Sequence, residues 1–176
     1  EQPIPEELRK EIQQLNQSCD NDLERSLILD RKLAHLFSSA IQKLLQTHNL
    51  QPSDISAIGS HGQTLRHAPT RENAYSLQIG DPNTIAEETG ITVVADFRRR
   101  DIAANGQGAP LAPTFHQAAF SSNDSNRAIV NIGGMANVSL LNKNKLSSGF
   151  DTGPGNILIN YWAQKHLNQS CDNNGE

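Results

Sequence analysis

The sequence predicts an α/β protein with two lobes, of which the second has only begun when the 176 residues end. Two amphipathic segments come first, and short apolar strands then alternate with helices. After a polar linker at residues 121–126, two apolar stretches around a glycine pair are typical of a β-hairpin. We therefore expect part of a first lobe over residues 1–120 and the start of a second over residues 127–176.

Apolar residues at helical spacing predict two N-terminal helices. The first covers residues 3–15 and the second, longer one covers residues 26–45. The apolar positions Leu29, Leu33 and Phe37 could either pack on a sheet of the same chain or form an interface with another chain, and the pattern alone leaves both open.

The segments between residues 55 and 97 have the signals of strands with one helix among them. Short strands are expected at residues 55–62 and 76–80. Between the second of these and the next strand, Asp81 at the N-cap, Pro82 at the first position and Gly90 past the end mark a helix. The β-branched run ITVVADF, residues 91–97, is typical of a strand that is buried on both faces.

The remaining elements are expected in the order helix, hairpin, strand, helix. A short helix covers residues 114–120, and a hairpin covers 127–141. A further strand ends near residue 150, and an apolar helix covers 156–167, with Pro154 near its start.

Composition excludes several classes of function. The formal net charge is −4, and the one basic cluster, residues 98–100, is followed at once by Asp101, so we expect no nucleic-acid partner. No apolar run approaches the ~20 residues that span a bilayer, and no signal peptide opens the chain, so we expect no membrane partner. Two cysteines make no disulfide framework, which favours the reducing cytoplasm. The ends look cut from a longer protein.

A first candidate site is IGSHGQT at residues 58–64, where a strand runs into a polar turn. His61, Gln63 and Thr64 offer donors and acceptors at the edge where open α/β sheets bind ligands, and they suit sugar hydroxyls. A zinc site with His67 lacks a supporting spacing, and a solvated loop histidine remains an alternative.

A second candidate site follows the strand at 91–97. Asp96 ends the strand and Asp101 follows it, and a carboxylate placed there can take a proton from a hydroxyl or from water. The arginines at 98–100 could hold anionic groups, or one of them could simply pair with Asp96. The glycines of the NGQGAP turn permit a close approach of the backbone.

Two glycine-rich turns are candidate anion sites. In the hairpin, backbone N–H groups at Gly133 and Gly134 could cradle a phosphate, or the pair could only make the turn. In GFDTGPGN, residues 149–156, Gly153 and Gly155 precede a helix whose N-terminus suits an anion, or they only serve the loop.

Together these motifs resemble one family, the bacterial anhydro-N-acetylmuramic acid kinases. The similar segments are GSHGQTLRHAP (59–69), LQIGDPNTIAEETGITVVADFRRRDIAANGQGAPL (77–111), NIGGMANVSLL (131–141) and GFDTGPGN (149–156). The resemblance implies an actin-like (ribonuclease H-like) ATPase and sugar-kinase fold with two lobes. It also implies a cytoplasmic enzyme that uses ATP and Mg²⁺ to phosphorylate O6 of 1,6-anhydro-N-acetylmuramic acid. Water opens the anhydro ring, and N-acetylmuramic acid 6-phosphate results, in recycling of cell-wall murein.

The resemblance also assigns roles to residues. It implies that Asp96 is the general base that activates water, with Asp101 as the second choice. The residues that would bind the amino sugar are His61, Gln63, Thr64, Arg98 and Gln107. The residues that would contact ATP are Asn131, Gly133, Gly134, Asn137, Asp151, Gly153 and Gly155. No metal ligand is assigned, and a homodimer is possible.

The sequence also departs from the family pattern. The glycine-rich GTSxDGxD-like segment that helps to bind ATP is absent, most of the second lobe is absent, and Asn105 stands where a glycine is expected. Because phosphoryl transfer needs several groups and a metal positioned at once, we expect these 176 residues alone to be inactive. The alternatives are a non-catalytic sugar- or nucleotide-binding module, an interaction scaffold, and an ATP-independent hydrolase, which the lack of a second well-placed carboxylate disfavours.

Overall fold

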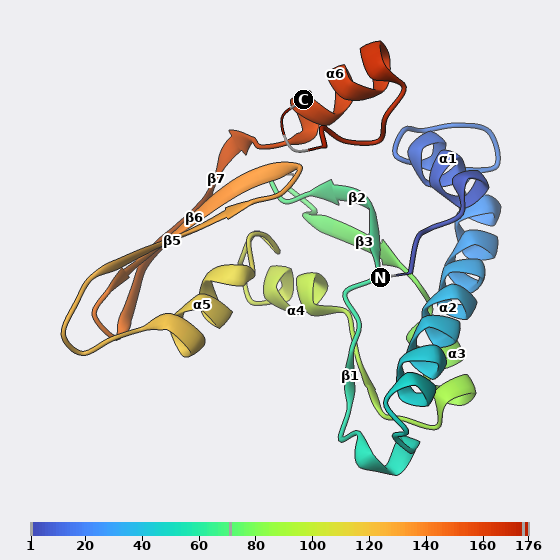
Figure 1. Ribbon diagram of the computed structural model, residues 1–176, viewed down its shortest axis with the longest axis horizontal. Helices are drawn as coiled ribbons and strands as arrows, with labels where there is room; N and C mark the ends of the chain where they lie inside the picture. Colours follow the sequence, from blue (N-terminus) through green and yellow to red (C-terminus); the bar gives the residue numbers. More distant parts are fainter. Residues whose placement is uncertain (1, 71, 174, 176) are drawn as a thin grey trace. The chain divides into compact units, whose positions relative to one another are not determined.

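The computed structural model describes residues 2–70, 72–173 and 175, and the chain divides into two compact units, Glu1–Gly108 and Ala109–Glu176 (Figure 1). The linker expected at residues 121–126 lies inside the second unit. The boundary falls earlier in the chain because the helix before this linker packs on strands that follow it. Which unit holds the sugar and which holds ATP stays a prediction.

Helices and short strands alternate in the first unit. In chain order they are α1 (Glu6–Leu15), α2 (Asp22–Thr47), a 3-10 turn (Pro52–Asp54), β1 (Ile58–Gly59), β2 (Gln63–Ala68), β3 (Tyr75–Ile79), α3 (Pro82–Thr89), β4 (Val93–Val94) and α4 (Phe97–Ala103). The two predicted N-terminal helices are confirmed. In the described part of the chain, no helix combines the length and the apolar character that crossing a membrane requires.

The core of the first unit lies between the two N-terminal helices and the β2–β3 hairpin. Its buried residues are Ile12, Leu15, Leu29, Leu33, Leu65 and Ile79. Phe37 packs against this cluster from α2. Leu29 and Leu33 therefore bury their side chains within their own chain. Of the two alternatives, packing on the sheet and an interface with another chain, the structure supports packing on the sheet.

The strand expected at residues 91–97 is much shorter than predicted. Only β4 is extended there, and among the described residues it pairs in parallel with β1, Ile58 opposite Val93. It is also not buried on both faces, since Val94 is 50% exposed. The extended run ends because Asp96 adopts a left-handed conformation, φ 61°, and begins α4.

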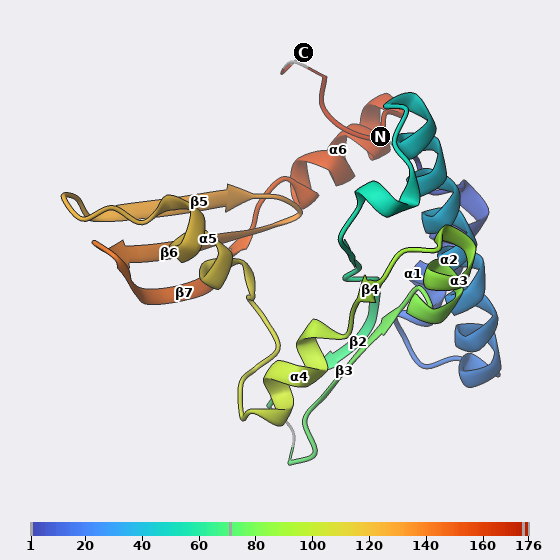
Figure 2. The same cartoon turned by 90° about the horizontal axis from the view of Figure 1, so that it is seen from below.

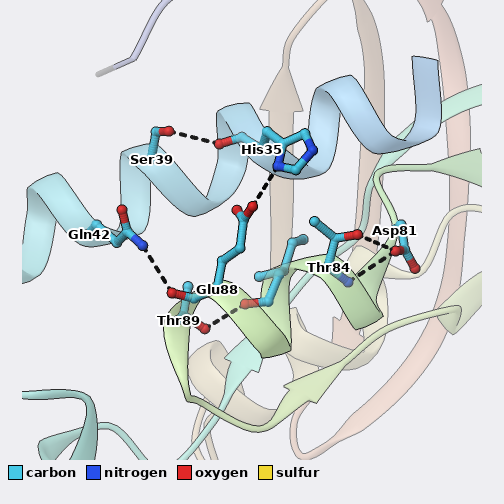
Figure 3. A network of polar contacts seen from close by, with 8 residues as sticks. His35, Ser39, Gln42, Asp81, Thr84, Glu88 and Thr89 are labelled. Carbon is cyan, nitrogen blue, oxygen red and sulfur yellow. Dashed lines mark hydrogen bonds and ion pairs between the residues drawn. The ribbon is translucent and has the colours of Figure 1, made fainter. Parts of the chain in front are cut away.

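Helix α3 has the ends that its sequence predicts. The Asp81 carboxylate accepts hydrogen bonds from the backbone N–H groups of Asn83 and Thr84, and Gly90 ends the helix at φ 68°. Contacts to α2 hold α3 in place, as Figure 3 shows: His35 Nδ1 lies 2.6 Å from Glu88 Oε1, and Gln42 donates to the Glu88 carbonyl.

The second unit is a three-stranded antiparallel sheet with a helix on it. Its elements are α5 (Ala112–Phe120), β5 (Arg127–Ile132), β6 (Met135–Asn142), β7 (Lys145–Pro154) and α6 (Ile157–Leu167). The predicted hairpin is confirmed as β5–β6, and β7 pairs with the other edge of β6. On α5, buried His116 bonds Ser139 Oγ of β6 at 2.8 Å, which joins the helix to the sheet.

The closing helix α6 is confirmed, but the place expected for Pro154 is wrong. Pro154 is the last residue of β7, where it pairs with Met135, and α6 begins only at Ile157. Proline fits there because β7 is an edge strand and needs no N–H on its outer side.

Candidate functional site

A cavity of about 180 Å³ lies in the first unit, where α2, β3 and the ends of β1 and β4 meet. Its polar lining residues are Asp30, Ser60, His61, Gln78, Asp96 and Arg99. Figure 2 shows β4 leading into α4, and α4 contacts β3. The site is therefore built from segments that lie far apart in the sequence.

Asp96 is the predicted base, and it lies at the edge of this cavity. Its side chain is 49% exposed, and its Oδ2 lies 3.2 Å from Arg99 Nη1. Both interpretations of the sequence therefore have a basis, because Asp96 pairs with an arginine and also lines the cavity. An exposed pair of this kind contributes little to stability, and the left-handed conformation of Asp96 is one that aspartate adopts more readily than most residues.

A wider, open hollow of about 710 Å³ adjoins the same residues. Asp96 and Arg99 line both hollows, and Tyr75, Ser76 and Arg100 line the wider one. A molecule bound in either hollow would therefore meet the Asp96 carboxylate.

His61 and Arg98, both predicted to bind the sugar, contact each other. His61 Nδ1 donates to the Gly62 carbonyl at 2.8 Å, and Nε2 accepts from Arg98 Nε at 2.8 Å. Because a carbonyl only accepts and a guanidinium only donates, these contacts fix the neutral tautomer with its proton on Nδ1. Arg98 also donates to the Gly108 carbonyl, so it joins the turn at His61 to the NGQGAP loop. His67, weighed as a second zinc ligand, bonds Ser76 instead.

Asp101, the second candidate base, holds this loop. Its carboxylate accepts from the Gly108 N–H at 2.7 Å, and its carbonyl accepts from the Gly106 N–H at 2.9 Å. A Cβ atom at Gly106 would overlap the carboxylate, which explains the glycine. Asp101 does not line the cavity, and its contacts instead hold the loop that carries Gln107.

Gln63 and Thr64 do not lie in a loop at the sheet edge as expected. Both belong to β2, and neither lines the cavity. Gln63 bonds the Thr64 carbonyl, and Thr64 Oγ1 accepts from Gln78 Nε2 at 3.1 Å. Gln78, opposite Thr64 on β3, lines the cavity in their place. A turn is expected from the sequence where β2 lies, and no motif in the sequence predicts that Gln78 lines the cavity.

Asp30 is the other cavity residue that sequence reasoning missed. It lies on α2, and its Oδ1 accepts from the Gly80 N–H at 2.6 Å. Burial raises the pKa of this carboxyl, and the hydrogen bond from Gly80 opposes that rise. An aspartate within a long amphipathic helix has no local signal of function, since only the folding of α2 against β3 brings it here.

In the second unit, the two predicted glycine turns contact each other. The N–H groups of Gly155 and Asn156 donate to the carbonyls of Gly134 and Gly133, both at 2.8 Å. A Cβ atom at Gly155 would overlap the Gly133 carbonyl oxygen, so close approach of one backbone to another requires this glycine. The Gly155 amide, expected to face an anion, is therefore used within the protein, and so is the amide of the next residue, Asn156. Gly153, at φ 131°, has open space around it.

Three predicted polar residues form a row across the sheet. Asn131 pairs with Asn137, and Asn137 pairs with Asp151, so the three share one face of β5, β6 and β7. The side-chain oxygen Asn137 Oδ1 is buried and has no hydrogen-bond partner among the described residues. An acceptor left in that way costs roughly 1–3 kcal/mol, so position 137 is not chosen for stability alone.

The whole chain, residues 1–176, matches the family model for anhydro-N-acetylmuramic acid kinase. The chain belongs to this family. A relative from Pseudomonas syringae pv. syringae is 50% identical over 173 residues, which are 98% of this chain and 47% of the relative. One from Shewanella denitrificans is 52% identical over 176 residues, 99% of this chain and 48% of the relative. One from Neisseria meningitidis is 49% identical over 173 residues, which are 98% of this chain and 47% of the relative.

These relatives all carry the name anhydro-N-acetylmuramic acid kinase. The chain spans about half the length of the curated relatives it matches. Membership confirms the predicted fold class, since the family has an actin-like sugar-kinase fold and the chain is a mixed α/β part of it.

Proposed function

We propose that the protein acts as an ATP-dependent kinase on 1,6-anhydro-N-acetylmuramic acid in the cytoplasm. It phosphorylates O6 while water opens the anhydro ring, and it releases N-acetylmuramic acid 6-phosphate for murein recycling. The observation that carries the proposal is Asp96, a half-exposed carboxylate at the edge of a polar cavity, in a chain of this family.

Asp96 supplies the base for the hydrolytic half of the reaction. Its carboxylate accepts a proton from water as the water oxygen bonds to C1 of the sugar. The C1–O6 bond breaks, and O6 takes the terminal phosphoryl group of ATP, which leaves ADP.

Of the other residues predicted to bind the sugar, some contact it directly and the rest position their neighbours. His61 borders the cavity and contacts the sugar directly, and Arg98 fixes its ring and tautomer. Thr64 acts through the Gln78 amide, with Gln63 beside it on β2. Asp101 holds the loop that carries Gln107, and Gln107 contacts the sugar from this loop.

The second unit is the proposed site of ATP and Mg²⁺. The backbone N–H groups of the Gly133–Gly134 turn are the type that binds phosphate oxygens. The Asp151 carboxylate and the orphaned Asn137 oxygen are ligands of the kind that Mg²⁺ prefers. With Asn131 beside them, they would hold the metal–nucleotide, and Mg²⁺ would neutralise charge on the phosphates.

The proposal is tested on a kinase chain of the relatives' full length that contains these residues. The protein is incubated with the anhydro sugar, ATP and Mg²⁺, and ADP release and the sugar phosphate are followed together. Equal amounts of both products are expected, and the 176 residues alone should give neither. Ring opening without ATP would instead indicate the hydrolase, for which Asp30 now offers a second carboxylate in the cavity. Sugar binding without turnover would indicate a binding module.

We also propose that the kinase is a homodimer that binds neither nucleic acid nor membranes. The start of α2 supplies exposed apolar residues for an interface, Leu23 at 73% and Leu27 at 60% exposure. Light scattering coupled to size-exclusion chromatography, at two protein concentrations, measures the oligomeric state. A monomer at both concentrations would contradict the proposed dimer.

A further inference from the structure

Asp30 lines the same cavity as Asp96 although it comes from a different element. Asp30 lies on the long helix α2, and the cavity wall around it is completed by Ser60 and His61 after β1 and by Gly80 after β3. Cavities with a few converging polar groups are the usual form of a site for a small polar molecule. Asp30 therefore has the position of a ligand-binding residue.

The contact that holds Asp30 does not need its charge. Oδ1 accepts from the Gly80 N–H at 2.6 Å, and the Asp30 main-chain carbonyl accepts from the Asp81 N–H at 3.3 Å. The turn itself is closely packed, because a Cβ at Gly80 would come within 2.7 Å of the Phe37 ring. An asparagine oxygen could accept from Gly80 equally well, without the cost of partly burying a charge.

We propose that Asp30 binds the substrate, with its carboxylate accepting hydrogen bonds from hydroxyl or N–H groups of the amino sugar. This inference rests on the proposed function. A carboxylate has about four lone-pair positions, so backbone donors at the Gly80 turn leave acceptor capacity for a ligand. A sugar rich in hydroxyl groups supplies donors, and bonds to an ionised acceptor are stronger than those between neutral groups.

The alternative is that Asp30 only joins α2 to the turn after β3. The chain offers a matched control for that role. Glu88 also joins α2 to the neighbouring segment, through His35 at 2.6 Å, and it does not line the cavity (Figure 3). A purely structural carboxylate at position 30 should therefore behave like Glu88.

The test compares Asp30→Asn with Glu88→Gln in the full-length kinase chain. Binding of 1,6-anhydro-N-acetylmuramic acid is measured by titration calorimetry without ATP, and stability is measured by thermal unfolding. Asp30→Asn should weaken sugar binding about 10- to 100-fold, the loss expected for a hydrogen bond to a charged group. Glu88→Gln should leave the sugar Kd unchanged.

The outcomes separate this inference from the proposed function. If wild type and Asp30→Asn bind the sugar equally, Asp30 is only a structural contact and the inference is wrong. If wild type does not bind the sugar, the proposed function fails and the inference fails with it. If Asp30→Asn does not fold, a measurement on the wild-type protein alone still tests the inference. The Gly80 amide resonance should shift on addition of the sugar, and no shift would overturn the proposal.

Discussion

The two units of the chain differ in how their apolar and polar residues are used. In the first unit, fully buried leucines of α2 and the β2–β3 hairpin make a core, and a separate cavity gathers the polar residues. In the second unit, few apolar side chains are buried, and several on its sheet and on α6 are exposed, such as Ile132 at 68% and Trp162 at 55%. Its glycines bond to each other. The comparison teaches that a glycine-rich turn with the sequence of an anion site can use its backbone groups to hold the fold together.

The largest expected effect is a loss of stability from the core of the first unit. Leu33 is fully buried, and Leu33→Ala should lower the free energy of unfolding by about 2–5 kcal/mol, because it removes apolar contacts and leaves a cavity. The matched change in the second unit, Ile132→Ala, should cost less than about 0.5 kcal/mol in this 176-residue chain. Urea unfolding of both variants measures the difference, and equal losses would break the comparison.

An intermediate effect is expected where the two glycine turns meet. Gly155→Ala places a methyl group on the Gly133 carbonyl oxygen, and it should cost about 1–3 kcal/mol through overpacking. Gly134→Ala is the control, since the nearest atom to its new methyl group would be Ile157 Cβ at 4.0 Å. Thermal unfolding should show a clear loss for the first variant only. Similar melting temperatures would mean that the contact does not constrain the second unit.

A smaller, pH-dependent effect is expected at the N-cap of α3. Burial alone would raise the pKa of Asp81, but hydrogen bonds from Thr84 and Asn83 outweigh it and lower the pKa below its ordinary 3.8. The carboxylate therefore stabilises the fold above that value, and the contribution is lost as the pH falls through the lowered pKa.

The variant Asp81→Ala measures this contribution. It should lose about 1 kcal/mol at pH 7, and the difference from wild type should shrink below pH 3.8. Unfolding curves at both pH values test this, and a difference that stays constant with pH would show that the ionised cap is not responsible.

How far the sequence predicts this structure depends on how local the signal is. Both ends of α3 follow from Asp81 and Gly90, because helix caps are decided within a few residues. The strand at 91–97 is overestimated, because β-branched residues favour extended backbone without fixing where it ends, and among the described residues β4 pairs with β1 over two positions.

The candidate site divides in the same way. Asp96 and His61 can be found from motifs at the ends of strands, and the structure places both at the cavity. Asp30 and Gln78 cannot, because only packing of α2 and β2 against β3 brings them there. The contact between the two glycine turns is likewise not predicted, since it depends on β6 pairing with β7, which places Met135 opposite Pro154.

The most direct test of the central claim is the rate of ADP release by Asp96→Asn in the full-length kinase chain, with Asp101→Asn beside it. A general base contributes typically 10²- to 10⁴-fold, so Asp96→Asn should lose at least about 100-fold in kcat while sugar binding is retained. Asp101→Asn, which disturbs only the loop at Gly108, should retain much more activity. Full turnover by Asp96→Asn, or a larger loss in Asp101→Asn, would contradict the assignment of Asp96 as the base.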